Sequence, residues 1–85
     1  MKTQYLSGNT LKKEATVNGF VYVSYSTPIA RIENGQFMVS NKDYSVTTAC
    51  HFRRVIKNAT GLSMSIKEYR KQYPSNVKPA SYIAG

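Results

Sequence analysis

Acidic side chains are scarce in this chain. Its 85 residues include four Asp and Glu against twelve Lys and Arg, which gives a net charge of +8 at pH 7. An inhibitor that mimics DNA needs an acidic surface, so this composition argues against that class of protein. A small protein with such an excess of positive charge attracts phosphate polyanions or acidic protein surfaces instead.

Cysteine and long apolar runs are also lacking. Cys50 is the only cysteine, so no disulfide forms within the chain, and a disulfide-stapled secreted scaffold is excluded. The first residues contain one Lys with no apolar run behind it, and no window approaches 18 consecutive apolar residues. We therefore expect no signal peptide, no membrane span and a cytoplasmic location.

The chain has little of what catalysis or metal binding requires. His51 is the only histidine. On a helix its side chain points about 100° away from that of Cys50, so the two do not readily form a pair of nucleophile and base. We expect His51 to be a surface imidazole and Cys50 a semi-buried thiol. The four carboxylates are scattered, and the sequence contains no Cys-x-x-Cys, no His-Glu-x-x-His and no glycine-rich phosphate loop. We expect no enzymatic activity, no metal site and no cofactor.

Length and composition favour one folded unit. A chain of 85 residues has room for a single domain with a modest core. Hydrophobic residues make up 41% of it, and seven Tyr and three Phe are present, which is too apolar for a disordered basic tail. We expect a single domain over residues 1–85 with irregular or flexible ends at residues 1–15 and 75–85, where Leu11–Ala15 forms at most a helical turn.

The clearest strand signals lie between residues 17 and 40. Residues 17–25 are rich in β-branched and aromatic side chains and precede Thr27-Pro28, which predicts a strand. Residues 29–33 and 36–40 flank Asn34-Gly35, the pair best suited to a type I′ turn, which predicts a β-hairpin. An exposed edge of the strand at 17–25 would allow pairing with a second copy, as a homodimer.

A two-residue turn fixes the hairpin register. It pairs Ile32 with Phe37 and Ala30 with Val39 on the side that would face the core. The opposite side would carry the other side chains of the hairpin, which are Arg31, Glu33, Gln36 and Met38.

Two helices are predicted after the hairpin. The first runs from about Thr48 to Ala59, is capped by Ser45, Thr47 or Thr48, and stops at Thr60-Gly61. Its inward face would consist of Ala49, Phe52, Val55, Ile56 and Ala59.

The second helix is shorter and runs from Ile66 to Tyr73. Ser65 and Glu68 match a capping box, and Pro74 ends the helix. A strand that begins near Leu62 is the competing interpretation. Together these elements predict an α+β fold, with a small antiparallel sheet of about three strands, one main helix packed on its face and a second short helix.

The predicted helices hold half of the basic residues and only one acid, Glu68. This imbalance makes the basic side chains candidates for binding nucleic acid or a partner, whereas the plain alternative is a solvated helix surface. The candidates are Arg53, Arg54, Lys57, Lys67, Arg70 and Lys71. Exposed Tyr rings near them could stack on bases or anchor a partner, and the candidates are Tyr22, Tyr25, Tyr44 and Tyr73, with Tyr44 and Tyr73 preferred.

Two motifs carry a family resemblance. Residues 25–30 read Tyr-Ser-Thr-Pro-Ile-Ala, and residues 44–51 read Tyr-Ser-Val-Thr-Thr-Ala-Cys-His. This resembles a group of short bacteriophage and prophage proteins of unknown function that share an aromatic-x-Thr-Pro-Ile-Ala strand, a hairpin and a Tyr-Ser-x-Thr-Thr-x-x-His helix start. The likeness covers residues 20–57. Ala49-Cys50 replaces the Ser-Lys that those proteins often have, and no functional residue carries over.

The resemblance implies a phage gene product that acts in the cytoplasm of a bacterial host cell. Our first hypothesis is a small basic accessory protein that binds nucleic acid or a nucleoprotein complex through its basic helix face. The alternative is a non-enzymatic inhibitor of a host defence enzyme, such as an anti-CRISPR protein, that acts by protein–protein binding with anchors such as Met38 or Tyr82.

Overall fold

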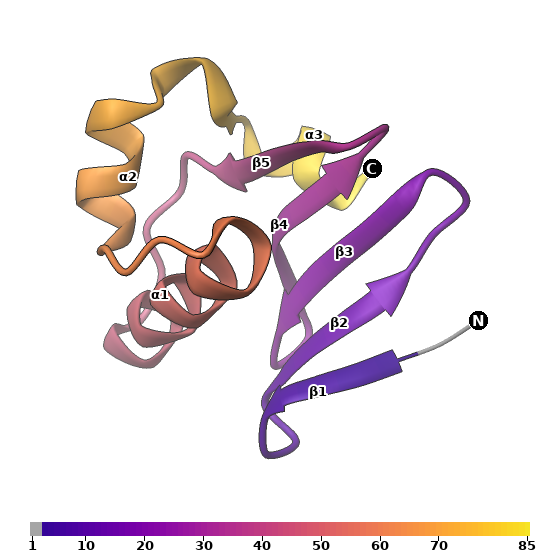
Figure 1. Cartoon of the computed structure of the whole chain (residues 1–85). Coiled ribbons are helices and arrows are strands. Elements are labelled where there is room, and N and C mark those ends of the chain that lie inside the picture. The colour runs from indigo at the N-terminus through magenta and orange to yellow at the C-terminus, as the bar shows by residue number, and fades with distance from the viewer. Residues whose placement is uncertain (1–2) are drawn as a thin grey trace.

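The computed structural model describes residues 3–85, which form a six-stranded sheet and three α-helices (Figure 1). The strands are β1 (Thr3–Ser7), β2 (Leu11–Ala15), β3 (Gly19–Ser24), β4 (Thr27–Glu33), β5 (Gln36–Ser40) and β6 (Val77–Lys78), and the helices are α1 (Val46–Thr60), α2 (Ile66–Gln72) and α3 (Ala80–Ala84). The strands follow chain order across the sheet, antiparallel from β1 to β5, with β6 parallel to β5. The fold is α+β, but the prediction of about three antiparallel strands is wrong.

The hairpin around Asn34-Gly35 is confirmed. β4 and β5 pair Ala30 with Val39 and Ile32 with Phe37, as the turn predicts. Both turn residues have positive φ, a conformation that Asn and Gly adopt at low cost. The side chains that these pairs direct to one face belong to the main core or pack against it.

Residues 3–7 and 11–15 form strands joined by a turn, contrary to the expected irregular end at 1–15, of which residues 1–2 lie outside the described part. Leu11–Ala15 is a strand rather than a helical turn because it pairs with β1 on one side and β3 on the other. In this strand Leu11 is fully buried, and Nζ of Lys13 lies 4.4 Å from the centre of the Phe20 ring, at cation–π distance. Both the apolar and the basic side chain therefore have a favourable contact.

The predicted strand at 17–25 is confirmed with narrower bounds as β3, which lies inside the sheet. Because it pairs with both β2 and β4, it has no free edge at which the same strand of a second copy could pair, contrary to the expected exposed edge. The outer positions of the sheet belong to β1 and β6.

α1 packs on the sheet through a continuous buried stripe. Its N-cap is Ser45, whose hydroxyl accepts from the Thr48 amide, and its C-cap is Gly61 in the left-handed conformation, so the helix extends slightly beyond the predicted 48–59. The buried side chains are Thr48, His51, Phe52, Val55 and Ile56. Ala49, predicted to face inward, is exposed.

α2 begins as the capping pattern predicts and ends one residue earlier. The Ser65 hydroxyl accepts a hydrogen bond from the Glu68 amide, and Ile66 and Tyr69 are buried. A strand near Leu62 is wrong, because residues 62–65 lie outside every strand. Across residues 3–85, every helix is too short or too polar to cross a bilayer.

The C-terminal residues 75–85 are ordered into β6 and α3, contrary to the expected irregular end. α3 lies on the face of the sheet opposite α1 and α2 (Figure 1). Ile83 is fully buried and Met38 is 2% exposed, while Nη1 of Arg31 donates to the carbonyl oxygen of Ile83 at the end of α3. Met38 therefore belongs to a second apolar layer and is unavailable as a surface anchor.

Candidate nucleic-acid interface

Three basic side chains of α1 line one groove of about 410 Å³. They share an exposed stripe because the neighbouring Phe52, Val55 and Ile56 point into the core. The lining residues of this α1 groove are Leu6, Arg53, Arg54, Lys57, Asn58 and Ser63. Among the described residues its lining contains three cations and no carboxylate, so the groove concentrates positive charge that no adjacent acid neutralises.

A fourth cation, Lys13 on β2, contacts a lining residue of the α1 groove. Its Nζ donates to Oδ1 of Asn58 at 3.3 Å, and the Tyr22 hydroxyl donates to the same oxygen at 2.8 Å. Burial raises the pKa of Tyr22 to about 12, so that hydroxyl stays protonated and keeps donating. Lys13 was missed as a site residue because the helix pattern gives no information about a residue on β2.

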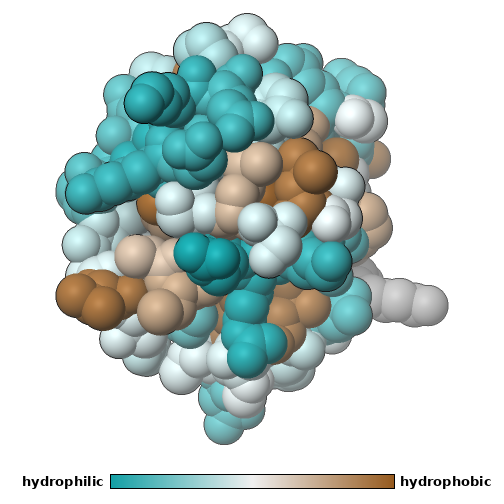
Figure 2. Space-filling model, turned by 60° about the vertical axis from the view of Figure 1, so that its left-hand side comes forward, coloured by the Kyte–Doolittle hydropathy of each residue, from teal (hydrophilic) through white to brown (hydrophobic). Residues whose placement is uncertain are grey.

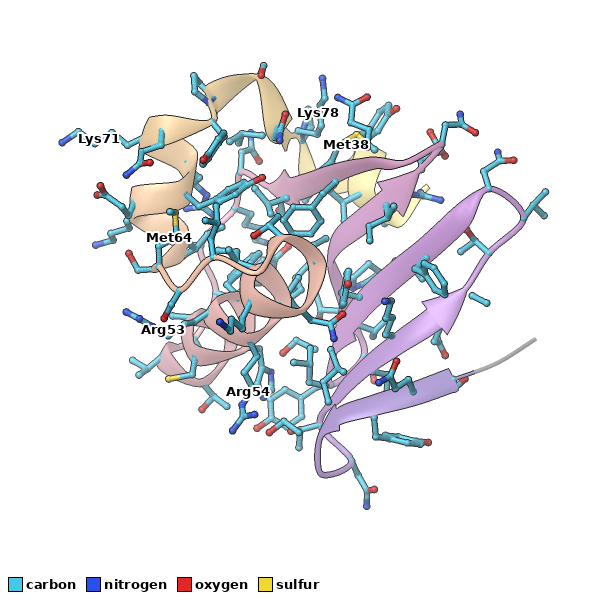
Figure 3. All side chains as sticks on the ribbon, viewed as in Figure 1. Met38, Arg53, Arg54, Met64, Lys71 and Lys78 are labelled. Carbon is cyan, nitrogen blue, oxygen red and sulfur yellow. The ribbon has the colours of Figure 1, made fainter. Side chains whose placement is uncertain are left out.

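The basic side chains of α2 do not extend the α1 groove. Lys67 lines a different groove of about 340 Å³ that also contains Asp43. In Figure 3, Lys71 projects from α2, well away from Arg54 on α1. Figure 2 shows hydrophilic side chains in separate areas over the helices, with apolar and near-neutral residues between them. The six predicted cations therefore do not form one surface.

Arg70 is a structural residue. Its guanidinium donates to the carbonyl oxygen of Ser40 at 2.9 and 3.2 Å and to that of Lys42 at 2.8 Å. It also bonds Asp43 at 2.6 Å and lies 5.6 Å from the Phe52 ring. Hydrogen bonding to Arg70, and then its charge, hold the pKa of Asp43 below the ordinary 3.8. Because four hydrogen bonds of the guanidinium already go to Ser40, Lys42 and Asp43, Arg70 is no longer a candidate for binding phosphate.

The four candidate Tyr rings differ in exposure. Tyr22 is fully buried. Tyr44 is half-buried, with its ring 6.3 Å from that of Phe52, and Tyr73 packs 4.7 Å from Tyr69. Tyr25 is 53% exposed and lies against α1, with its ring 5.7 Å from that of His51. Of the four, Tyr25 presents the most open ring.

His51 and Cys50 have exposures opposite to those expected. Cys50 is exposed, whereas His51 is 4% exposed and belongs to the buried stripe of α1. Its Nδ1 lies 2.6 Å from the Ser24 hydroxyl, and its Nε2 lies 3.3 Å from the Thr10 hydroxyl. The hydroxyls of Thr10, just before β2, and Ser24, at the end of β3, thus contact the imidazole. Helix periodicity gives no information about these partners.

The buried imidazole predicts that stability falls below neutral pH. Burial, and then the charge of Arg54, lower the pKa of His51 from 6.5. Below pH 6.5 the imidazole of His51 therefore becomes protonated more readily in the unfolded chain than in the folded one. The free energy of unfolding should accordingly decrease from pH 7.5 to 5.5. Urea denaturation at both pH values measures this change. The variant His51→Gln should lack the decrease, and an equal decrease in both proteins would contradict the assignment.

The pairing of Ser24 with His51 is buried. A hydroxyl hydrogen-bonded to an imidazole matches the pairing of a nucleophile with a base. Ser24 is only 1% exposed, however, so its hydroxyl is shielded from the solvent. Within residues 3–85, no three His, Cys, Asp or Glu side chains gather where they could hold a metal ion.

Comparison with known proteins gives a family and no further relative. No curated protein and no solved structure matches the chain. One family model, described as a family of unknown function, DUF8033, matches residues 1–74. This range contains β1 to β5, α1 and α2, and therefore every lining residue of the α1 groove. Because the match covers most of the 85 residues, the chain belongs to the family of unknown function DUF8033.

Proposed function

We propose that the protein binds nucleic acid, free or within a nucleoprotein complex, through the α1 groove and without catalysing a reaction. The observation that supports this proposal is the collection of Arg53, Arg54 and Lys57 in one groove whose lining holds no carboxylate. Ordinary helix surfaces intersperse both signs of charge, whereas a phosphate-binding surface carries an excess of one sign.

The side chains of the α1 groove suit contact with phosphates. Arg53 and Arg54 are exposed and have no carboxylate within ion-pair distance among the described residues. Nζ of Lys57 donates only to the Gly61 carbonyl at the helix end, at an exposed position from which it can turn outward. Each guanidinium can bind a phosphate through two parallel hydrogen bonds.

The test is a salt titration with labelled oligonucleotides. We expect the triple variant Arg53→Ala, Arg54→Ala, Lys57→Ala to bind at least tenfold more weakly at low salt than the natural sequence. The log–log slope of affinity against salt should become shallower by about 2 to 3, because each lost phosphate contact removes about 0.7 to 0.9. Lys67→Ala with Lys71→Ala, which removes two positive charges from α2, is the control and should retain most of the affinity.

Two outcomes would contradict this proposal. If the triple variant and the α2 control lose affinity equally, overall charge and not the α1 groove carries binding. If neither DNA nor RNA binds at about 50 mM salt, where phosphate contacts are strong, the proposed function itself is wrong.

The inhibitor hypothesis keeps one of its two named anchors, since Met38 is buried and Tyr82 is 48% exposed. No observation on the molecule favours it over nucleic-acid binding. A partner captured from bacterial lysate that survives nuclease treatment, and is lost with Tyr82→Ala, would favour it. The phage origin stays an expectation from the sequence resemblance alone.

A further inference from the structure

Tyr25 has a backbone conformation that its residue type disfavours. It occupies the first position of the two-residue turn between β3 and β4, with φ of 57°. For a bulky aromatic residue this conformation is an outlier, and it costs about 1–3 kcal/mol in comparable cases. The other positive-φ positions among the described residues are Asn34 and glycines, which adopt it readily. Strain of this kind at an exposed aromatic residue is typical of functional positions.

The Tyr25 turn contacts neighbouring residues through its backbone and its ring. The Tyr25 amide donates to the carbonyl oxygen of Thr10 at 2.7 Å, which ties the turn to the loop between β1 and β2. The ring lies 5.7 Å from the His51 ring at an interplanar angle of 40°. His51 is fixed in turn by Ser24 and Thr10. One side of the Tyr25 ring is thus supported, while 53% of the residue stays open to solvent.

The supported ring adjoins the α1 groove. Arg54 follows His51 by three residues on α1, so their side chains are neighbours on one side of the helix. Arg54 is a lining residue of the α1 groove. The buried His51 therefore contacts the Tyr25 ring and lies near Arg54, so that one residue separates the aromatic ring from the first cation of the groove.

We propose that Tyr25 is a stacking platform for an unpaired base, so that the preferred ligand of the α1 groove is single-stranded nucleic acid. This inference rests on the proposed function, because the cations beside Tyr25 hold the phosphates of the strand whose base stacks. Bases of a duplex are stacked on each other and present only their edges in the grooves, so they offer no face to an exposed ring. A single strand offers both a free base and an accessible backbone.

The first experiment uses the absence of tryptophan from the chain. Tyr25→Trp introduces a single fluorophore at the platform, and saturation with a ten-nucleotide oligo(dT) should strongly quench its emission, whereas a duplex of equal length should not. Tyr5→Trp is the control. Tyr5 is 58% exposed and pairs with Lys12, whose side chain points to the face opposite Lys13 and α1. Its emission should change little.

The second experiment separates binding from folding. Tyr25→Asn suits positive φ, so the midpoint of urea denaturation should stay equal or rise. Its affinity for oligo(dT) should nevertheless fall by about 5- to 150-fold, the range expected for the loss of one stacked base. A residue that served packing alone would give the reverse result, with lower stability and unchanged affinity.

The outcomes distinguish the two proposals. If Tyr25→Asn binds oligo(dT) as well as the natural sequence while the triple variant of the α1 groove does not, the stacking inference is overturned and the proposed function stands. Equal quenching of Tyr25→Trp by duplex and single strand would overturn the preference for unpaired bases. If no nucleic acid binds either protein at low salt, both proposals fall.

Discussion

Replacement of Arg70 by Met should lower the free energy of unfolding by about 3 kcal/mol, because the variant leaves the carbonyl oxygen of the buried Ser40 without its two guanidinium donors and removes the bond to the Lys42 carbonyl. Ser40 is fully buried, and its carbonyl accepts two of the guanidinium hydrogen bonds. The ion pair with Asp43 adds little, since 72% of that side chain is exposed and water screens its charge. The cost comes from the backbone groups that join α2 to the end of β5.

Thermal denaturation followed by circular dichroism measures this effect. A loss of about 3 kcal/mol in a domain of this size corresponds to a melting temperature lower by about 12–24 °C. Lys71→Met is the matched control, because it places the same side chain at the next, exposed position of α2 and should change stability by less than about 0.5 kcal/mol. Similar melting temperatures for the two variants would show that the contacts of Arg70 do not stabilise the fold.

Gly19→Ala should lower stability by about 2–3 kcal/mol through a backbone overlap. A Cβ atom at Gly19 would overlap the carbonyl oxygen of Ile32 and lie 2.9 Å from its carbonyl carbon. Neither is the end of a flexible side chain, so the start of β3 must move away from β4, where Gly19 pairs with Glu33. Urea denaturation gives the change as a lower midpoint at constant slope.

Gly8→Ala provides the comparison for Gly19→Ala. Gly8 has φ of 52°, and no atom lies within 4 Å of the position that a Cβ atom would take there. Alanine at this position would therefore lower stability only through its disfavoured backbone conformation, by about 1 kcal/mol. If Gly19→Ala is no more destabilising than Gly8→Ala, the close approach of β3 to Ile32 is not a constraint on the fold.

The sequence predicted correctly those elements that are specified by turn and cap residues within the element itself. Asn34-Gly35 specified both the turn and the register, and Ser65 specified the start of α2, because turn and cap residues act on backbone groups within a few positions. Residues 11–15 have no such signal. Their lysines and glutamate favour a helix or a loop, and only pairing on both sides makes them a strand, which is a tertiary effect that overrides propensity.

The candidate site was predicted in part for the same reason. Helix periodicity placed Arg53, Arg54 and Lys57 on one stripe, and the structure brings them into one groove. Periodicity also placed Arg70 with the other cations of α2, yet its partners lie about 30 residues earlier, at the end of β5 and in the loop after it, which the helix pattern does not position. Lys13 and Tyr25 reach α1 only through the sheet, so their place beside it depends on long-range contacts.

The agreement between chain order and sheet order has a consequence for the kinetics of folding. From β1 to β5, each strand meets the strand that directly precedes it, so these pairings close short loops at a small entropic cost and are expected to form early. β6 is different, because its pairing with β5 must enclose residues 41–76, which include both α1 and α2. The C-terminal residues should therefore be the last to gain protection from hydrogen exchange during refolding, after the α1 groove is complete.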